Sequence, residues 1–241
     1  MAIPVNPVYF SYVTHTLALI SSIFVLVWCI SFRGGLAWEH PDKTLIFNVL
    51  LRNKHKFRVI CIHPVLMLIG FIILGGEAII SYKALPFEKP VKKLIHLVLH
   101  ATALILGCIG IYTAFKYHNE SNIANLYSLH SWLGMGVIVL YGIQWIYGLV
   151  VFFYPGGSHE MRRDSLPWHV LLGMFVYALA IGTAALGFLE KLTFLENSGV
   201  AKYGSEAFLV NFTAIFAVLF GAFVFFTAVS QPPPHDGYSA I

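Results

Sequence analysis

Residues Leu126–Gly134 read LYSLHSWLG, and this stretch opens an apolar run that continues to Tyr154. Such a run exceeds the roughly 20 apolar residues that an α-helix needs to cross a bilayer. It nevertheless places an ionisable ring, His130, a few residues inside its start. Ionisable side chains at membrane depth are costly and usually serve a function. The stretch therefore predicts a spanning helix that carries a functional histidine near one membrane surface.

The composition of the whole chain agrees with a membrane protein. Of its 241 residues, 58% are hydrophobic and 11% are charged, and the mean hydropathy is +0.77. A soluble domain has about 25% charged residues. The formal net charge is only +4. We therefore expect membrane lipid around the chain and no nucleic-acid partner.

Six apolar segments are long enough to span a membrane, which predicts an all-α membrane protein because backbone polar groups in lipid must be satisfied within each helix. An even number of spans places both termini on one side. Of the fifteen Lys and Arg, six lie on the side of the termini and nine lie on the opposite side. Four of these nine lie in the single stretch Arg52–Arg58, so the distribution of positive charge leaves the orientation in the membrane open. The predicted spans are Val8–Phe32, Val59–Tyr82, Lys93–Phe115, Leu126–Tyr154, Pro167–Leu189 and Ala207–Ser230.

Four histidines lie near the starts of the second to fifth spans: His63, His96, His130 and His169. Successive helices run in opposite directions, so His63 is expected level with His130, and His96 level with His169. Each lies about 5–8 Å below its entrance at 1.5 Å per residue. The two levels would then be about 15–20 Å apart in a core about 30 Å thick.

A bis-histidine pair inside a helical bundle suits haem iron, which takes axial ligands from facing side chains. Both HSWLG and HVLLG have the pattern H-x-x-x-G, which places Gly134 and Gly173 one turn below their histidines, where a flat ring could lie. Helix packing is the alternative role for these glycines. His100 lies one turn from His96 and is a possible substitute ligand, although the depth of His96 matches His169 better. His15 has no evident partner.

These segments resemble the cytochrome b561 family, and among its members the plant ascorbate-dependent transmembrane ferrireductases. The similar segments are FRGGLAW, HPVLMLIGFIILGGEAIISYK, KPVKKLIH, NLYSLHSWLG, YPGGS, LPWHVLLG and LGFLEKLTF. The resemblance implies six helices, of which the inner four hold two b-type haems. It assigns His63 and His130 to the non-cytoplasmic haem, and His96 and His169 to the cytoplasmic haem. It also implies cytoplasmic termini, a vacuolar (tonoplast) membrane and a homodimer.

The resemblance also implies the substrates. Cytoplasmic ascorbate is the expected donor, bound by Lys89, Lys93 and Arg162, and a basic mouth would attract this monoanion. The expected acceptor is monodehydroascorbate or a ferric chelate, bound on the far side beside His118, with Tyr117 and Asn119 lining the site. Five further positions match residues that contact haem edges or propionates in the family: Lys83, Asn125, Tyr127, Ser128 and Glu190.

One segment departs from the family pattern. About thirteen extra residues, LLRNKHKFRVICI at 50–62, separate FNV from the His63–Pro64 pair. They make the His63 site the least certain of the four. We treat residues 1–230 as one membrane domain with this extra loop, and we expect 231–241 to be a disordered tail. A metal-ion transporter with intramembrane histidines, or a structural scaffold, remains an alternative.

Overall fold

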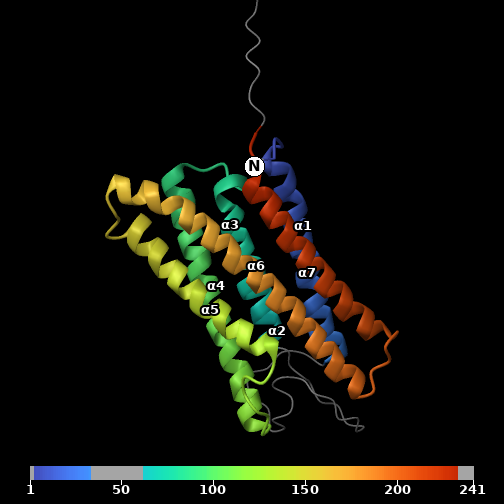
Figure 1. The fold of residues 1–241 in the computed structure, drawn as a ribbon. Helices are drawn as coiled ribbons and strands as arrows, with labels where there is room; N and C mark the ends of the chain where they lie inside the picture. The colour runs from blue at the N-terminus through green and yellow to red at the C-terminus, as the bar shows by residue number, and fades with distance from the viewer. Residues whose placement is uncertain (1–2, 34–61, 233–241) are drawn as a thin grey trace, which may run out of the picture.

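The computed structural model describes residues 3–33 and 62–232, and within these residues it confirms six helices long and apolar enough to cross a membrane. Three of the six contain π-helical segments (η). The elements are α1 (Pro7–Val27) with η1 (Trp28–Phe32), α2 (Ile62–Val65) with η3 (Leu66–Ile73) and α3 (Leu74–Ala84), α4 (Lys89–Glu120), α5 (Leu129–Gly148) with η4 (Leu149–Phe153), α6 (His159–Asn197), and α7 (Ser205–Val229) (Figure 1).

Several predicted bounds were wrong, because an apolar window marks only the part of a helix that lies in lipid. α6 begins at His159, two turns before the predicted start at Pro167. The side chain of Ser158 caps this helix, because its hydroxyl oxygen accepts a hydrogen bond from the backbone amide of Met161 at 3.1 Å. At about 1.5 Å per residue α6 is about 58 Å long, so its ends project into water. α4 likewise extends beyond both predicted ends. The fourth helix starts at Leu129, because Leu126 has a positive φ of 54° and belongs to the preceding turn.

The second to fifth spans form a closed ring of four helices. α3 packs on α4, α4 on α5, α5 on α6, and α6 returns to η3 and α7. α1 and α7 pack along one another outside this ring and contact α3 (Figure 1). This arrangement agrees with the expected inner bundle of four. The predicted segments Val59–Cys61, most of 50–62 and most of the tail lie outside the described residues.

Both ends of the described chain meet on one side of the bundle. The amide of Ile3 donates to the Val229 carbonyl at 3.3 Å, and the amide of Gln231 donates to the Ile3 carbonyl at 3.0 Å. We call this side the terminal face; α4 and α6 begin there (Figure 1). α2, α5 and α7 begin on the opposite face. The prediction that the termini share one side is confirmed.

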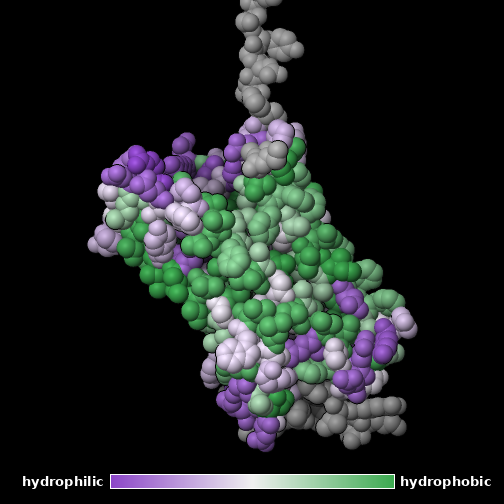
Figure 2. All heavy atoms as spheres, in the orientation of Figure 1, coloured by the Kyte–Doolittle hydropathy of each residue, from purple (hydrophilic) through white to green (hydrophobic). Residues whose placement is uncertain are grey.

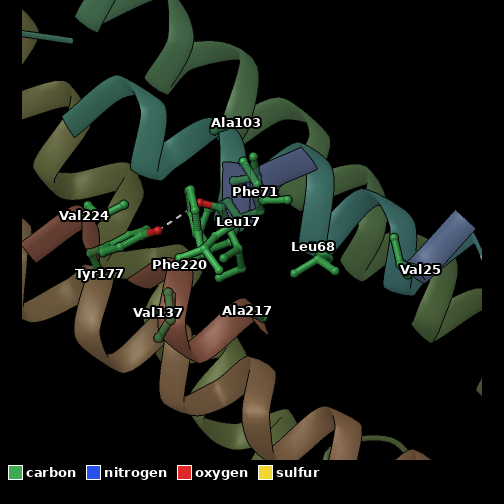
Figure 3. Close-up of a cluster of buried hydrophobic side chains, with 14 of the residues drawn as sticks. Leu17, Val25, Leu68, Phe71, Ala103, Val137, Tyr177, Ala217, Phe220 and Val224 are labelled. Atoms are coloured by element: carbon green, nitrogen blue, oxygen red, sulfur yellow. Dashed lines mark hydrogen bonds between the residues drawn. The ribbon is translucent and has the colours of Figure 1, made fainter. Parts of the chain in front are cut away.

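The core is tightest where α3, α6 and α7 meet. A Cβ added at Gly76 would lie 2.5 Å from the hydroxyl of Tyr177 and 2.7 Å from the ring of Phe220. Only glycine allows these helices to approach so closely. The Tyr177 hydroxyl donates to the Ile72 carbonyl at 3.2 Å, which satisfies a polar group in the membrane interior (Figure 3). This contact fixes α6 against the π-helical segment η3.

The surface is divided as expected for a bilayer protein. Figure 2 shows hydrophobic residues across the middle of the visible face and hydrophilic residues gathered at its two ends. Near the opposite face, Glu206 at the start of α7 forms an ion pair with Arg33 and accepts from the indole of Trp28 at 2.9 Å. These contacts tie the end of the first span to the start of the last.

Candidate functional site

The ring of four helices brings the four predicted histidines together as two pairs. His63 and His130 form the opposite-face pair, with ring centroids 6.3 Å apart. His96 and His169 form the terminal-face pair, also with centroids 6.3 Å apart. The pairing and the levels are those that the alternating helix directions predicted.

The separation within each pair suits two imidazoles on opposite sides of one metal ion. An imidazole nitrogen lies about 2.0 Å from a bound metal and about 1.2 Å from its own ring centroid, so two trans ligands place their centroids about 6.4 Å apart. The centroids of both pairs are 6.3 Å apart, close to this separation. The histidines therefore fit axial ligation of haem iron, and this role stays a prediction.

Hydrogen bonds at Nδ1 set the direction of each ring. His63, His96 and His130 place Nδ1 at 2.8, 2.8 and 2.9 Å from the backbone carbonyls of Gly110, Ala78 and Thr183 respectively. With the proton on Nδ1, the other ring nitrogen carries the lone pair that a metal needs. His169 differs, because its Nδ1 lies 3.0 Å from the side-chain amide nitrogen of Gln144, which is a donor and also donates to the His169 carbonyl at 2.6 Å.

These partners follow a regular spacing along the helices. On three helices, the residue 14 positions after a histidine contacts a histidine of the other pair. Gly110 follows His96 and contacts His63, Gln144 follows His130 and contacts His169, and Thr183 follows His169 and contacts His130. Fourteen residues rise about 21 Å in an α-helix. Each helix therefore supplies a ligand at one level and an orienting group at the other, and the two levels are about 21 Å apart along the helices.

The second span keeps the same levels with one extra residue. Ala78, which holds His96, follows His63 by 15 residues instead of 14. The π-helical segment η3 (Leu66–Ile73) lies between them. A π-turn bonds i to i+5 and so takes up an additional residue without adding a full step of rise. The local helix type thus keeps His63 level with His130.

Two glycines allow the rings to approach the helices that hold them. A Cβ at Gly187 would lie 2.7 Å from Cε1 of His130, and one at Gly148 would lie 3.0 Å from Cε1 of His169. Both glycines come four residues after an orienting residue, so α5 and α6 share the pattern H-x₃-G-x₉-(Q/T)-x₃-G. A Cβ at Gly134 would lie 3.6 Å from the Thr183 side chain, and a Cβ at Gly173 would lie 3.2 Å from the amide nitrogen of Gln144. That these two glycines make room for a haem ring stays a prediction.

The terminal-face pair opens into a cavity of about 800 Å³. Such a volume is within the range of small-molecule and cofactor sites, about 300–1,000 Å³. Its walls come from α3, α4, α5, η4 and α6, and include both histidines of the pair. All three residues predicted to bind ascorbate, together with Lys83, line this cavity: Lys89, Lys93 and Arg162. Their positive charges suit an anion.

Aromatic side chains close the cavity around these groups. The ammonium of Lys93 lies over the ring of Phe153, 5.7 Å from its centroid. The neighbouring Phe152 lies 5.1 Å from the ring of His169. Lys83 donates to the Ser230 carbonyl at 3.2 Å, which also fixes the end of α7. The cavity therefore combines a cationic lining with an apolar interior.

On the opposite face, the residues predicted for the acceptor side come together around the α4–α5 turn. The ring of His118 lies 5.9 Å from Tyr117 and 6.1 Å from Tyr127. The side chain of Asn119 accepts from Asn125 at 2.7 Å. The structure thus gathers the predicted acceptor residues and two of the predicted haem contacts in one place.

The carboxylate of Glu190 joins α6 to this turn. It accepts from the Ser128 hydroxyl at 3.1 Å and from the hydroxyl of Tyr127. Burial, and after it the negative charge of Glu190, raises the pKa of Tyr127. The phenol therefore stays protonated and keeps donating. Next to it, Lys191 is 8% exposed and close enough to His63 to interact electrostatically.

Comparison with known proteins identifies the family. Residues 62–195, more than half of the chain, match the family model described as eukaryotic cytochrome b561. The chain belongs to the cytochrome b561 family. Membership implies b-type haem as the cofactor, and it decides between the electron carrier and the transporter that the sequence left open. Within the described residues no group of three or more His, Cys, Asp or Glu converges on a metal site, whereas the four histidines occur in pairs.

Named relatives are similar over almost the whole chain. Transmembrane ascorbate ferrireductase 1 of Arabidopsis thaliana is 65% identical over 96% of this chain and 91% of its own length. Probable ascorbate-specific transmembrane electron transporter 1 of Oryza sativa subsp. japonica is 61% identical over 98% and 97%. Transmembrane ascorbate-dependent reductase CYB561 of Sus scrofa is 38% identical over 83% and 73%.

Sequence reasoning missed the residues that orient the histidines. Gln144, Gly148 and Gly187 belong to the repeat shared by α5 and α6, which a comparison of the two apolar runs could have found. No such signal marks Tyr141, whose hydroxyl hydrogen-bonds His100 in the core.

Two other histidines are explained by their surroundings. The ring of His100 packs 4.4 Å from that of His96, while His96 itself faces His169. His15 was expected to have no evident partner, but its Nδ1 lies 2.9 Å from the Glu77 carboxylate. Pairing reduces the cost of two ionisable groups in the membrane.

Proposed function

We propose that this chain transfers electrons from cytoplasmic ascorbate across the membrane to monodehydroascorbate or a ferric chelate, using two b-type haems. One haem would be held by His96 and His169, and the other by His63 and His130. The observation that carries the proposal is the equal 6.3 Å separation of both histidine pairs at two levels of one bundle. The relatives named for ascorbate-dependent reduction support the donor and the reaction type.

The haem and the polypeptide chain would contribute different parts of the electron transfer. Haem b with two histidine ligands supplies reversible one-electron iron chemistry. The chain fixes the ligand rings, through hydrogen bonds at Nδ1 that also tune their electron donation. It places the two levels about 21 Å apart along the helices, inside a hydrocarbon core about 30 Å thick. One level therefore serves each membrane surface.

At the terminal face, the residues that line the cavity would bind the donor. Ascorbate is a monoanion, and Lys89, Lys93 and Arg162 surround the cavity that contains the terminal-face pair. Cationic groups around an apolar pocket concentrate an anion and hold its oxygens by charge-assisted hydrogen bonds. We infer that this face is cytoplasmic, so both termini are cytoplasmic as well.

At the opposite face, the cluster around His118 would bind the acceptor. The imidazole, the amide of Asn119 and the phenol of Tyr117 offer hydrogen bonds to an oxygen-rich acceptor. Glu190 holds the turn that carries Tyr127 and Ser128, and so keeps the cluster against the opposite-face pair. Residues near the haem edges on this face would include Asn125. A vacuolar membrane and a homodimer are further parts of the proposal, supported by the family resemblance.

The test uses the full chain purified with its haem. We expect two haems per chain, both low-spin, and both reduced when ascorbate is added. In vesicles loaded with a ferric chelate, external ascorbate should reduce the trapped iron. Fewer than two haems per chain, or a haem protein that ascorbate cannot reduce, would contradict the proposal.

A further inference from the structure

Lys191 is a buried cation on the side of α6 that faces the opposite-face pair. It is 8% exposed and close enough to His63 to interact electrostatically. Thr183 and Gly187 precede it by eight and four residues, so the three share one face of the helix. The Thr183 carbonyl lies 2.9 Å from Nδ1 of His130, and a Cβ at Gly187 would lie 2.7 Å from the same ring. Lys191 continues this row of contacts towards the opposite face.

The repeat shared by α5 and α6 gives the other pair an apolar residue at the same position. Four residues beyond its second glycine, the repeat has Phe152 in the fourth span and Lys191 in the fifth. The ring of Phe152 lies 5.1 Å from the ring of His169, so a side chain at this position reaches a histidine pair. One pair therefore has an aromatic ring where the other has a buried positive charge.

The cations of the terminal face differ from Lys191 in their burial. Lys89 and Arg162 are exposed, and Lys93 is only partly buried, although all three line the cavity. Solvent and salt weaken the field of an exposed charge, whereas a buried charge is screened much less. Lys191 is therefore the cation expected to act most strongly on a neighbouring metal centre.

We propose that the positive charge of Lys191 raises the redox potential of the opposite-face haem. The inference rests on the proposed function. A haem core with two neutral histidine ligands carries one positive charge when its iron is ferric and none when its iron is ferrous. A nearby cation therefore destabilises the oxidised form relative to the reduced form, and the potential rises. The carboxylate of the adjacent Glu190 is directed to Ser128 and Tyr127, and it offsets only part of this charge.

The test compares variants of the full haem protein. Lys191→Met keeps an unbranched side chain and removes the charge, so it should lower the potential of one haem. Lys191→Gln removes the charge but keeps a hydrogen-bonding group, and it should do the same. Lys191→Arg carries a positive charge at every working pH and should keep the parent potential. Lys202→Met is the matched control, because it removes an exposed lysine from the same face.

The measurement is a spectroscopic redox titration that resolves the two haems. We expect Lys191→Met and Lys191→Gln to weaken the reduction equilibrium of one haem by about tenfold, which is about 59 mV for one electron. The other haem, and both haems of Lys202→Met, should keep the parent potentials. The shift should persist at high salt, because the charge is buried. Lys191→Met in the His96→Ala protein, which should retain only the opposite-face haem, identifies the haem that shifts.

Four results would overturn the inference. They are parent potentials in both neutral variants, equal shifts of both haems, a shift in Lys191→Arg as large as that in Lys191→Met, and a shift in Lys202→Met of the same size. If Lys191→Met does not fold, Lys191→Gln decides alone. Loss of the opposite-face haem from both neutral variants would also count against it, because Lys191 would then hold the haem and not tune it. Failure of the proposed function would be seen differently, because the parent protein would then bind fewer than two haems or resist ascorbate.

Discussion

Substitution of Gly187 by alanine should remove the opposite-face haem while leaving the other in place. The new Cβ would lie 2.7 Å from Cε1 of His130 and 3.0 Å from its Nδ1. Ordinary contact begins near 3.4 Å, so the ring must move by about 0.7 Å. It would move away from α6, which stretches the 2.9 Å bond to the Thr183 carbonyl to about 3.6 Å, beyond hydrogen-bonding range.

The free-energy terms can be compared directly. The lost hydrogen bond costs about 0.5–1.5 kcal/mol, and overpacking costs about 1–3 kcal/mol. Alanine in a helix regains about 0.5–1 kcal/mol relative to glycine. The net cost of about 0.5–4 kcal/mol acts on the position of His130, and so corresponds to a loss of about 2- to 900-fold in affinity for the opposite-face haem.

The assay is the haem content per chain, combined with a redox titration of the reduced-minus-oxidised spectrum. Gly182→Ala is the matched control, since nothing lies within 4 Å of its new Cβ on the same helix. We expect two haems in Gly182→Ala and loss or altered potential of one haem in Gly187→Ala. Gly148→Ala, whose Cβ would lie 3.0 Å from Cε1 of His169, should affect the other haem instead.

The reasoning would be refuted if Gly187→Ala kept two haems with the parent potentials. It would also fail if Gly182→Ala lost haem to the same extent, because helix content and not contact with His130 would then explain the effect. A variant of Gly148 that altered the same haem as Gly187→Ala would contradict the assignment of one glycine to each level.

Three further outcomes are expected. His96→Ala should bind one haem in place of two, and unchanged haem content would contradict the pairing. Lys93→Gln should lower kcat/KM for ascorbate by about tenfold at low salt, and by less at high salt because salt screens charges. Lys202→Gln, on the opposite face, should leave kcat/KM for ascorbate unchanged. Equal effects of the two substitutions would contradict the donor site. Glu190→Gln should lower the raised pKa of Tyr127 towards its ordinary value, because the phenolate no longer meets a carboxylate. Tyrosinate absorbance followed from pH 9 upwards should then rise earlier than in the parent, and coincident curves would argue against the contact.

The spans and the pairing of the histidines could be predicted because both depend on local pattern. Apolar length fixes which segments cross the membrane, and alternation of helix direction fixes which histidines share a level. Helix direction alone pairs His63 with His130, and His96 with His169. Helix ends were less predictable: the α6 start at His159 depends on a capping serine in a polar segment, not on hydrophobicity.

The groups that aim the histidines could not be predicted in the same way. Every residue has a backbone carbonyl, so nothing in the amino-acid sequence distinguishes Gly110 or Ala78 as hydrogen-bond acceptors. Their selection depends on how far each helix rises and turns before it meets its neighbour. The π-helical segment η3 is a further case, because it compensates for one extra residue between His63 and Ala78.

The order of the residues is enough to predict six membrane crossings and a histidine near the start of each inner span. This follows because burial in lipid constrains length and polarity locally. The packing of the helices, in contrast, sets the 6.3 Å separation of the rings, the hydrogen bond between Gln144 and His169, and the close approach of two glycines to His130 and His169. These depend on how closely helices pack, and packing is fixed by all the side chains of an interface together.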